Sequence, residues 1–296
     1  MNKLTLATWL GVGFLLTSCG EKKEPAAAQA PAEEGYVLAD NEAVPAPGVI
    51  ARIESTMTLD EGSMTVSAGG QEMAGTMTRR DSEVKTLEGL PGNKARYLLV
   101  EAEATGSMVL NGNERPVPGE PKPLLGLPVM IEQKDGTWTA TLESGTATPE
   151  QEEELAKIAK RNGSRESLTM YGTDPRKPGD RWQVNPADLS SFGSIEAMEG
   201  TMELEFVEVT DFQGTPCAVI KSTFEVTGNT PSDGTGNSMK VTFKGDSLIH
   251  RSLADLEDID AKVNGTMTIH GTVGPQAEMH VEGPMTILET ITLTKP

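Results

Sequence analysis

The chain has 296 residues, a formal net charge of -19 and an aromatic content of only 4%. This length is sufficient for one large or two small hydrophobic cores. A strongly acidic protein repels phosphate backbones, so the charge argues against nucleic-acid binding. Aromatic residues are scarce while methionine occurs 14 times, so we expect an aliphatic core whose irregular gaps are filled by methionine.

The first residues have the features of an export signal. Lys3 precedes an apolar stretch over residues 4–16, which leads into the sequence Leu-Thr-Ser-Cys ending at Cys19. A charged start, a short apolar run and small residues before a cleavage point are typical of a signal peptide. The run is shorter than the ~20 apolar residues that a membrane-spanning helix needs. We therefore predict a signal peptide over residues 1–18.

The Leu-Thr-Ser-Cys sequence resembles the lipobox of bacterial lipoproteins, in which the cysteine thiol receives a diacylglycerol before cleavage. This resemblance implies that Cys19 is lipidated with acyl chains such as palmitate, and that the mature protein is anchored on a membrane of the cell envelope. Stable anchoring requires two or more chains, which lipoproteins of this kind carry. Gly20 follows the cysteine, where an aspartate would favour inner-membrane retention, so the outer membrane is favoured over the inner membrane. The alternative is an ordinary secretory signal that contains a cysteine.

The segment after the lipobox differs in composition from the rest of the chain. Residues 19–48 are rich in Ala, Pro, Glu and Gln and cannot bury enough apolar area to fold. We predict that they form a disordered tether, which can lift a domain tens of Å from the membrane. Residues 49–296 are predicted to be the globular part, either as one domain or as two lobes that meet near residues 145–180.

From Val49 onward the sequence is typical of β-structure, because short apolar-polar alternations are separated by glycine-containing turns. Met202, Leu204 and Phe206, for example, alternate with glutamates. Strands are predicted over residues 95–103, 127–132, 137–142, 201–210, 239–248, 261–273 and 279–293. The expected fold is mainly β with one central α-helix, built as a curved antiparallel sheet or as two half-barrel lobes.

One segment has the sequence features of the predicted α-helix. Thr148 is placed as its N-cap, Pro149 as its first residue and Gln151 at the capping-box position. Leu155 and Ile158 share a face, which makes a narrow apolar stripe. Such a stripe suits a helix that lies on a sheet or closes the mouth of a barrel.

Three short sequences around this helix carry a family resemblance. They are Leu-Leu-Gly-Leu-Pro-Val at 124–129, Asp-Gly-Thr-Trp at 135–138 and Pro-Gly-Asp-Arg-Trp at 178–182. Their order resembles a family of uncharacterised lipoproteins and secreted proteins of planctomycete and verrucomicrobial type, from about residue 124 to the C-terminus. The family has no assigned activity, so the resemblance implies a fold and a compartment but no site residues.

The usual catalytic motifs are absent from the sequence. It contains no nucleophile elbow, zinc-protease helix motif, Cys-x-x-Cys pair or phosphate-binding glycine loop. Cys217 lies in an apolar stretch and is expected to be a small buried hydrophobe. The acidic run over residues 255–260 does not fit a calcium-loop template and is interpreted as a solvated loop. We therefore predict a non-enzymatic protein without a cofactor.

Five methionines have a shared context, because each follows Gly-Ser or Gly-Thr. We expect the glycine to end a turn, the hydroxyl residue to face water and the methionine to begin the inward face of a strand. If those faces converge, flexible methionine side chains would line an interior that adapts to apolar ligands. The alternative is that methionine simply fills the core. The residues are Met64, Met77, Met108, Met202 and Met267.

Two histidines are a further candidate site. If residues 274–276 form a hairpin turn, His270 faces His280 across the strand pair, with Glu282 on the same face. Two histidines in this arrangement can begin a transition-metal site. The alternative is a pair of exposed strand histidines.

The sequence thus favours a membrane-anchored envelope lipoprotein that binds a hydrophobic ligand, such as a lipid, or a partner protein. The first alternative is an inert structural or surface-interaction module without a ligand. The second is a hydrolase whose site has no recognisable motif.

Overall fold

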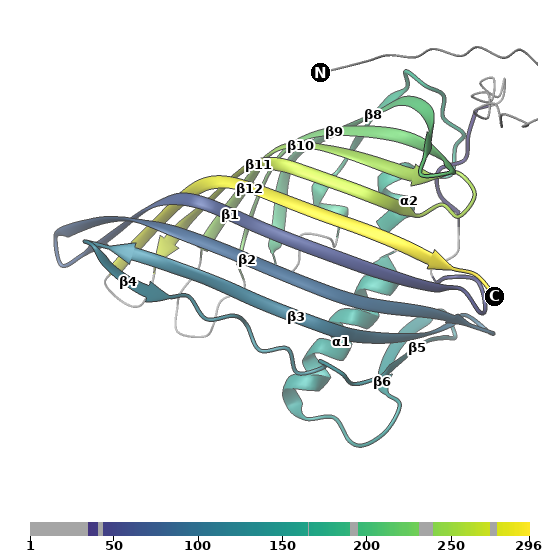
Figure 1. The fold of residues 1–296 in the computed structure, drawn as a ribbon, viewed down its shortest axis with the longest axis horizontal. Helices are drawn as coiled ribbons and strands as arrows, with labels where there is room; N and C mark the ends of the chain where they lie inside the picture. The colour runs from purple at the N-terminus through teal and green to yellow at the C-terminus, as the bar shows by residue number, and fades with distance from the viewer. Residues whose placement is uncertain (1–34, 41–43, 165, 190–194, 231–238, 273–276) are drawn as a thin grey trace, which may run out of the picture.

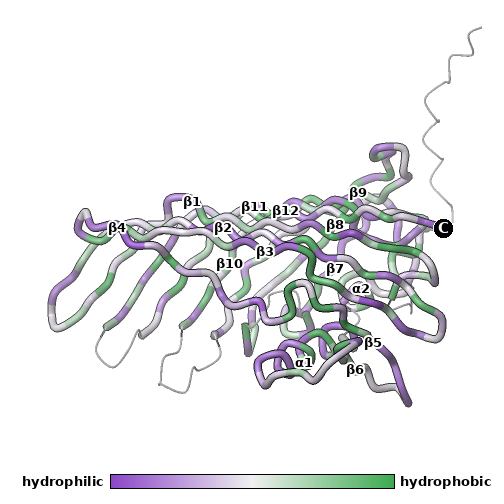
Figure 2. The backbone as a smooth tube through the Cα atoms, turned by 60° about the horizontal axis from the view of Figure 1, so that its bottom comes forward, coloured by the Kyte–Doolittle hydropathy of each residue, from purple (hydrophilic) through white to green (hydrophobic). Residues whose placement is uncertain are grey.

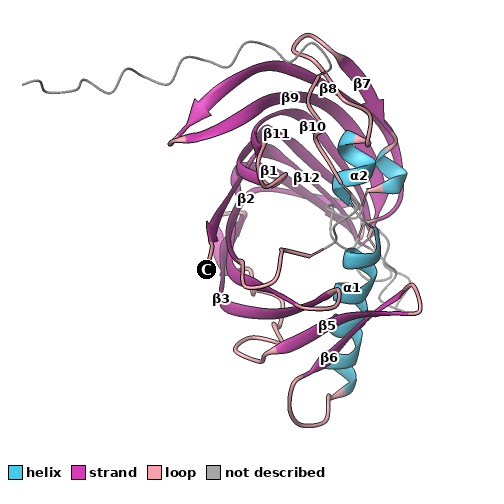
Figure 3. Cartoon of the chain, turned by 90° about the vertical axis from the view of Figure 1, so that its right-hand side faces the viewer, coloured by secondary structure: helices cyan, strands magenta, loops and turns pink. Residues whose placement is uncertain are grey.

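A computed structural model describes residues 35–40, 44–164, 166–189, 195–230, 239–272 and 277–296 of the chain. These residues form one antiparallel sheet of 12 strands, which curves strongly and carries helices near one of its ends (Figures 1 and 2). The two outermost strands of the sheet do not pair with each other, and helix α1 lies on the open side between them (Figure 3). The sheet is therefore a half-barrel rather than a closed barrel.

The strands follow a simple order. Across the sheet it is β6-β5-β3-β2-β1-β12-β11-β10-β9-β8-β7, and the short β4 pairs only with β3. The elements are β1 (Ile50–Ala68), β2 (Gln71–Leu90), β3 (Lys94–Leu110), β4 (Asn113–Pro116), β5 (Val129–Lys134), β6 (Thr137–Leu142), α1 (Pro149–Ser164), α2 (Glu166–Tyr171), β7 (Arg181–Val184), the 3-10 helix η1 (Pro186–Asp188), β8 (Glu196–Phe212), β9 (Thr215–Asn229), β10 (Met239–Ser252), β11 (Asp258–Thr272) and β12 (Ala277–Thr294).

Pairing of the first strand with the last makes the fold one unit. β1 runs antiparallel to β12 along nearly its whole length, from Ile50 opposite Thr294 to Ala68 opposite Ala277. This pairing confirms the predicted curved antiparallel sheet and excludes the alternative of two separate lobes. The region near residues 145–180 holds the helices α1 and α2 rather than a division between lobes.

Glycines lie inside the strands, and this overturns one expectation about the methionine sequences. A Cβ atom on Gly75 would lie 1.8 Å from the Val109 carbonyl oxygen, and one on Gly265 would lie 2.4 Å from that of Lys244. These glycines therefore allow close approach of neighbouring strands instead of ending turns. A glycine that ends a turn and a glycine inside a strand look alike in a sequence. The predicted starts of the strands that contain these methionines were therefore wrong. The methionines themselves do face inward.

Helix α1 begins as its sequence predicts. The Thr148 amide donates to Gln151 Oε1 at 2.9 Å, and the Gln151 amide donates to Thr148 Oγ1 at 3.4 Å. These two bonds form the capping box. Leu155 and Ile158 are buried in a core with Ile131 of β5, so α1 packs on the sheet. The short helix α2 was not predicted.

The packed domain begins earlier than residue 49. Leu38 and Ala39 are 0% and 1% exposed. Tyr36 and Arg176 exchange two backbone hydrogen bonds of 2.8 Å. The predicted tether over residues 19–48 is therefore too long at its C-terminal end. The prediction missed this boundary because the Val-Leu-Ala sequence is too short to stand out from a polar stretch. The signal peptide and Cys19 lie outside the described residues.

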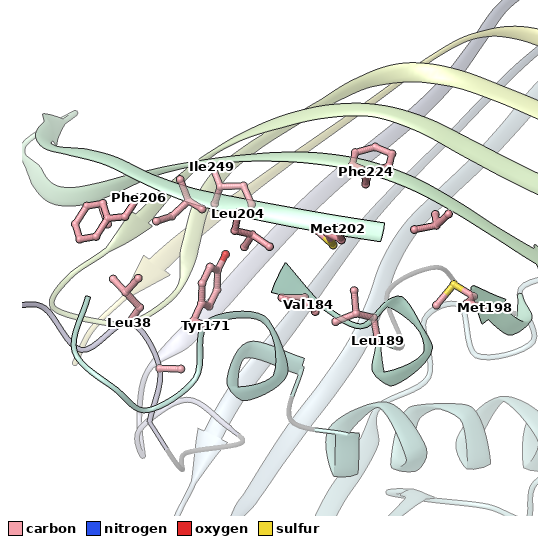
Figure 4. Close-up of a cluster of buried hydrophobic side chains, with 14 residues drawn as sticks. Leu38, Tyr171, Val184, Leu189, Met198, Met202, Leu204, Phe206, Phe224 and Ile249 are labelled. Carbon is pink, nitrogen blue, oxygen red and sulfur yellow. The ribbon is translucent and has the colours of Figure 1, made fainter. Parts of the chain in front are cut away.

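The largest core lies between β8, β9, β10 and the segment around α2. Its buried members include Leu38, Tyr171, Leu204, Phe206 and Ile220, and Figure 4 displays most of the cluster. The N-terminal segment and helix α2 thus cover one end of the inner face of the sheet.

A polar network borders this core and corrects the interpretation of the acidic run. Tyr171 Oη lies 2.9 and 3.0 Å from the two carboxylate oxygens of Asp258, and Arg251 Nη1 lies 2.6 Å from Asp258 Oδ1. Arg251 Nε also donates to the Leu38 carbonyl. Lys295 binds Asp255 at 2.6 Å. The acidic run is therefore a set of ion-pair partners rather than a solvated loop.

Candidate functional site

The inner face of the sheet is the one on which the helices pack. Leu87 of β2 packs against the core that contains α1. Side chains alternate between the two faces of a strand, so Met77, ten residues before Leu87, points to the same side. The inner face therefore continues along β2 beyond the helices, which lie under the other end of the sheet (Figure 2).

An apolar cluster covers this continuation of the inner face. We call it the methionine cluster. Its buried members are Leu59, Met64, Val241, Met267, Val281 and Met285, and partly buried members that pack against them include Met57, Met77, Met108, Met279 and Phe243. The cluster draws on β1, β2, β3, β10, β11 and β12, so it spans the middle of the curved sheet.

Four of the five predicted ligand-binding methionines belong to the methionine cluster. They are Met64, Met77, Met108 and Met267. Met202 does not, because it lies opposite Val184 of β7 and is buried in the core around Tyr171. Periodicity places a residue on a face but not on a particular part of it, so the sequence could not separate Met202 from the others.

A band of charged side chains lies beside the methionine cluster on the same face. We call it the charged band. It consists of Arg79, Asp81, Glu83 and Lys85 of β2 together with Glu289 of β12. Asp81 is paired with Met57 across the strands, and Glu83 with Ser55. The sequence analysis missed these residues.

Three of the five side chains in the charged band have a close ion-pair partner. Arg79 donates two hydrogen bonds to the Asp81 carboxylate, at 2.7 and 2.8 Å. Such bidentate pairs are geometrically specific. Lys122 donates to Glu83 at 2.7 Å. These four charges therefore form two ion pairs on the floor of the half-barrel.

The neighbouring strand β3 makes room for these charges. Its inward positions opposite Arg79, Asp81 and Glu83 are Gly106, Ala104 and Ala102. Arg79 Nη1 also donates to the Pro118 carbonyl, at 3.2 Å. Small residues on β3 thus leave space above the sheet in which long charged side chains can lie.

Lys85 and Glu289 differ from the other charges of the band. Among the described residues, neither forms a hydrogen bond or an ion pair within 4.0 Å. Burial lowers the pKa of Lys85, with Glu289 as the strongest opposing charge. Burial likewise raises the pKa of Glu289, against the effect of Lys85. Both shifts have the direction expected for charges that lose water without gaining a close partner.

An apolar groove lies outside the half-barrel floor. A groove of about 470 Å³ separates β6 from α1 and is lined by Trp138, Ala140, Leu142, Leu155 and Ala159, among others. It is open to solvent along the edge of the sheet. No charged side chain except Glu152 lines it.

The two histidines face each other as predicted. His270 is opposite His280 in the pairing of β11 with β12, and their ring centroids are 5.9 Å apart. Glu282 Oε2 lies 3.7 Å from His280 Nε2. Within the described part of the chain, no three His, Cys, Asp or Glu residues are grouped in a way that could hold a metal ion.

Cys217 is buried, as predicted. Burial raises the pKa of its thiol to about 11. A thiol with such a pKa is protonated at neutral pH and is a poor nucleophile.

No described helix is both long enough and apolar enough to cross a membrane. No protein-family model matches the chain, and no curated protein matches it.

Several solved structures match the chain, all at low similarity. A lipovitellin structure, described by its lipid-protein interactions, is 10% identical with a TM-score of 0.44, and the match covers 84% of this chain but only 26% of that one. An outer membrane channel from Pseudomonas putida F1 is 11% identical with a TM-score of 0.23, over 86% and 98% of the two chains. A DUF1329 family protein from Desulfovibrio piger is 9% identical with a TM-score of 0.14, over 83% and 85%. The similar structures thus include bacterial domains of unknown function.

Proposed function

We propose that this protein is a non-enzymatic, lipid-anchored protein of the cell envelope, which binds an apolar ligand on the inner face of its half-barrel. The observation that carries the proposal is the methionine cluster, a continuous apolar surface on the concave side of a sheet that does not close. The lipobox at Cys19 supports a membrane location. The resemblance to uncharacterised bacterial lipoproteins supports the same compartment.

The chemistry of the cluster favours a ligand of variable shape. Methionine is unbranched and polarizable, so a surface rich in it can repack around different apolar groups. Concave sites lined by apolar side chains are the usual form of small-molecule sites. The competing proposal is an inert structural module, in which methionine only fills the core. A hydrolase would in addition turn over its ligand.

A probe-binding experiment distinguishes these proposals. The full chain, purified as the Cys19→Ser variant so that it lacks its own acyl chains, is titrated with an environment-sensitive fatty-acid probe. We expect saturable fluorescence enhancement, because the probe would leave water for the methionine cluster. Folded protein that binds no probe would support the structural module. Release of product from an ester analogue of the probe would support the hydrolase.

A matched pair of variants locates the site. Met77→Glu places a carboxylate in the methionine cluster and should weaken probe binding by about tenfold or more, since an unpaired charge next to an apolar ligand costs at least the ~1.4 kcal/mol of one decade. Thr76→Glu introduces the same charge on the exposed opposite face and should leave binding unchanged. Equal effects would place the probe elsewhere. Circular dichroism and thermal melting verify that both variants fold.

A further inference from the structure

The charged band separates two apolar parts of the inner face. Along β2 the inward positions run from Met77 through Arg79, Asp81, Glu83 and Lys85 to Leu87, so an apolar end, a charged middle and a second apolar end follow one another. A surface that served only as a filled core would exclude Lys85 and Glu289 in particular, because burying a charge without a close partner is costly. The middle of the inner face is thus suited to a polar group.

Lys85 lies among charges of both signs. The charges that act most strongly on it are those of two carboxylates, Glu289 and Glu83, and two further cations, Arg161 and Lys122. Lys122 is already paired with Glu83, so Glu289 is the main carboxylate that opposes the charge of Lys85. Burial also raises the pKa of Glu289, which favours its uncharged form.

We propose that Lys85 binds the anionic head group of a single-chain amphiphile, a carboxylate or a phosphate, whose hydrocarbon chain lies on the methionine cluster. This inference rests on the proposed function, to which it adds the chemical class of the ligand. The head group supplies the close partner that Lys85 lacks among the described residues.

The dimensions of the inner face fit such a ligand. Lys85 lies four residues from Asp81 along β2, which corresponds to ~13 Å, and Asp81 is opposite Met57. A bilayer core of ~30 Å holds two layers of chains, so one extended chain occupies ~15 Å. A chain whose head group contacts Lys85 therefore reaches the level of Met57 and of Ile287, its partner across the strands. Both residues are members of the methionine cluster.

A head-group series tests the proposal. Compounds with one fixed saturated chain and a carboxylate, phosphate or hydroxyl head group compete with the fluorescent probe for the full-length Cys19→Ser chain. We expect the carboxylate or the phosphate to compete at a concentration about tenfold or more below that of the alcohol, because a hydrogen bond to a charged partner is worth at least one decade in affinity. The stronger of the two anions identifies the head group.

Variants of Lys85 assign this preference to one residue. Lys85→Gln should abolish the difference between anion and alcohol, whereas Lys85→Arg should retain it. Lys262→Gln, on the exposed face of β11, removes the same charge without touching the site and should behave like the parent chain. A preference that persists in Lys85→Gln would overturn the proposal, as would an alcohol that competes as well as the anions. If no compound and no probe binds the folded protein, the proposed function itself fails.

Discussion

Replacing Arg251 should lower the free energy of unfolding through the loss of a small number of identified contacts. Its side chain is 2% exposed and lies 4.1 Å from the centre of the Tyr171 ring. It binds the Asp258 carboxylate and the Leu38 carbonyl, so it joins the sheet to both α2 and the N-terminal segment. Arg251→Met keeps most of the apolar volume but removes the charge and every donor.

The expected loss of stability can be worked out from this geometry. Breaking a buried ion pair by removing one partner typically costs ~3–5 kcal/mol, because the other charge stays buried. Asp258 is 28% exposed and keeps its hydrogen bond from Tyr171. We therefore expect about 3 kcal/mol for Arg251→Met, at the lower end of that range. A loss of this size corresponds to a fall of roughly 6–12 °C in melting temperature for a domain of this size.

Urea denaturation and thermal melting measure this effect. Arg52→Met is the control, since the Arg52–Glu54 pair is 43% and 54% exposed and such surface pairs are worth only ~0–1 kcal/mol. Limited proteolysis provides a second readout, because loss of the bond to Leu38 should make residues 35–40 more accessible to cleavage. A change in unfolding free energy no larger than that of the Arg52 variant would refute this reasoning.

The other predictions concern titration, anchoring and metal. Burial raises the pKa of Glu257 from 4.5 to about 7. The stability that this group contributes is therefore complete below about pH 4.5 and is lost as the pH rises through about 7. Between these pH values, the melting temperature of Glu257→Gln should fall less than that of the parent chain. Cys19→Ser should move the protein from the membrane fraction to the soluble fraction on cell fractionation, and retention in high salt would place the anchor elsewhere. Zinc or copper should change the melting temperature of His270→Ala as much as that of the parent chain, because a lone histidine pair makes a weak site. A shift in melting temperature that is confined to the parent chain would establish a metal site at His270 and His280.

Elements with a strong local pattern could be predicted from the sequence. The α1 helix has a capping box at Thr148 and charges that match its dipole, and it begins where expected. The apolar face of strands such as the one containing Leu204 and Phe206 was also predicted correctly, although this strand begins before the predicted residue 201. In both cases the signal lies within one turn or one strand, so no knowledge of distant contacts is needed.

The candidate site could not be predicted in the same way. In β2 both faces carry charges around residues 79–88, so the apolar-polar alternation that identifies a half-buried strand is lost. Arg79 and Arg80 look equivalent in the sequence, although only Arg79 belongs to the inner charged band. Their roles depend on curvature of the sheet and on the small residues of β3, which lie far along the chain.

The position of the N-terminal segment also changes what the anchor can do. A tether over residues 19–48 would reach ~90 Å if fully extended, at ~3.1 Å per residue. Tyr36 and Leu38 are held by Arg176 and Arg251, so the predicted tether would have to end before residue 35, and its predicted reach falls to ~50 Å. A lipidated Cys19 would thus keep the half-barrel within about 50 Å of the membrane that carries it. If the proposed anchor and ligand are both correct, exchange of an amphiphile between that membrane and the inner face would require no second attachment, because a tether of this length would keep the local concentration of the membrane surface high.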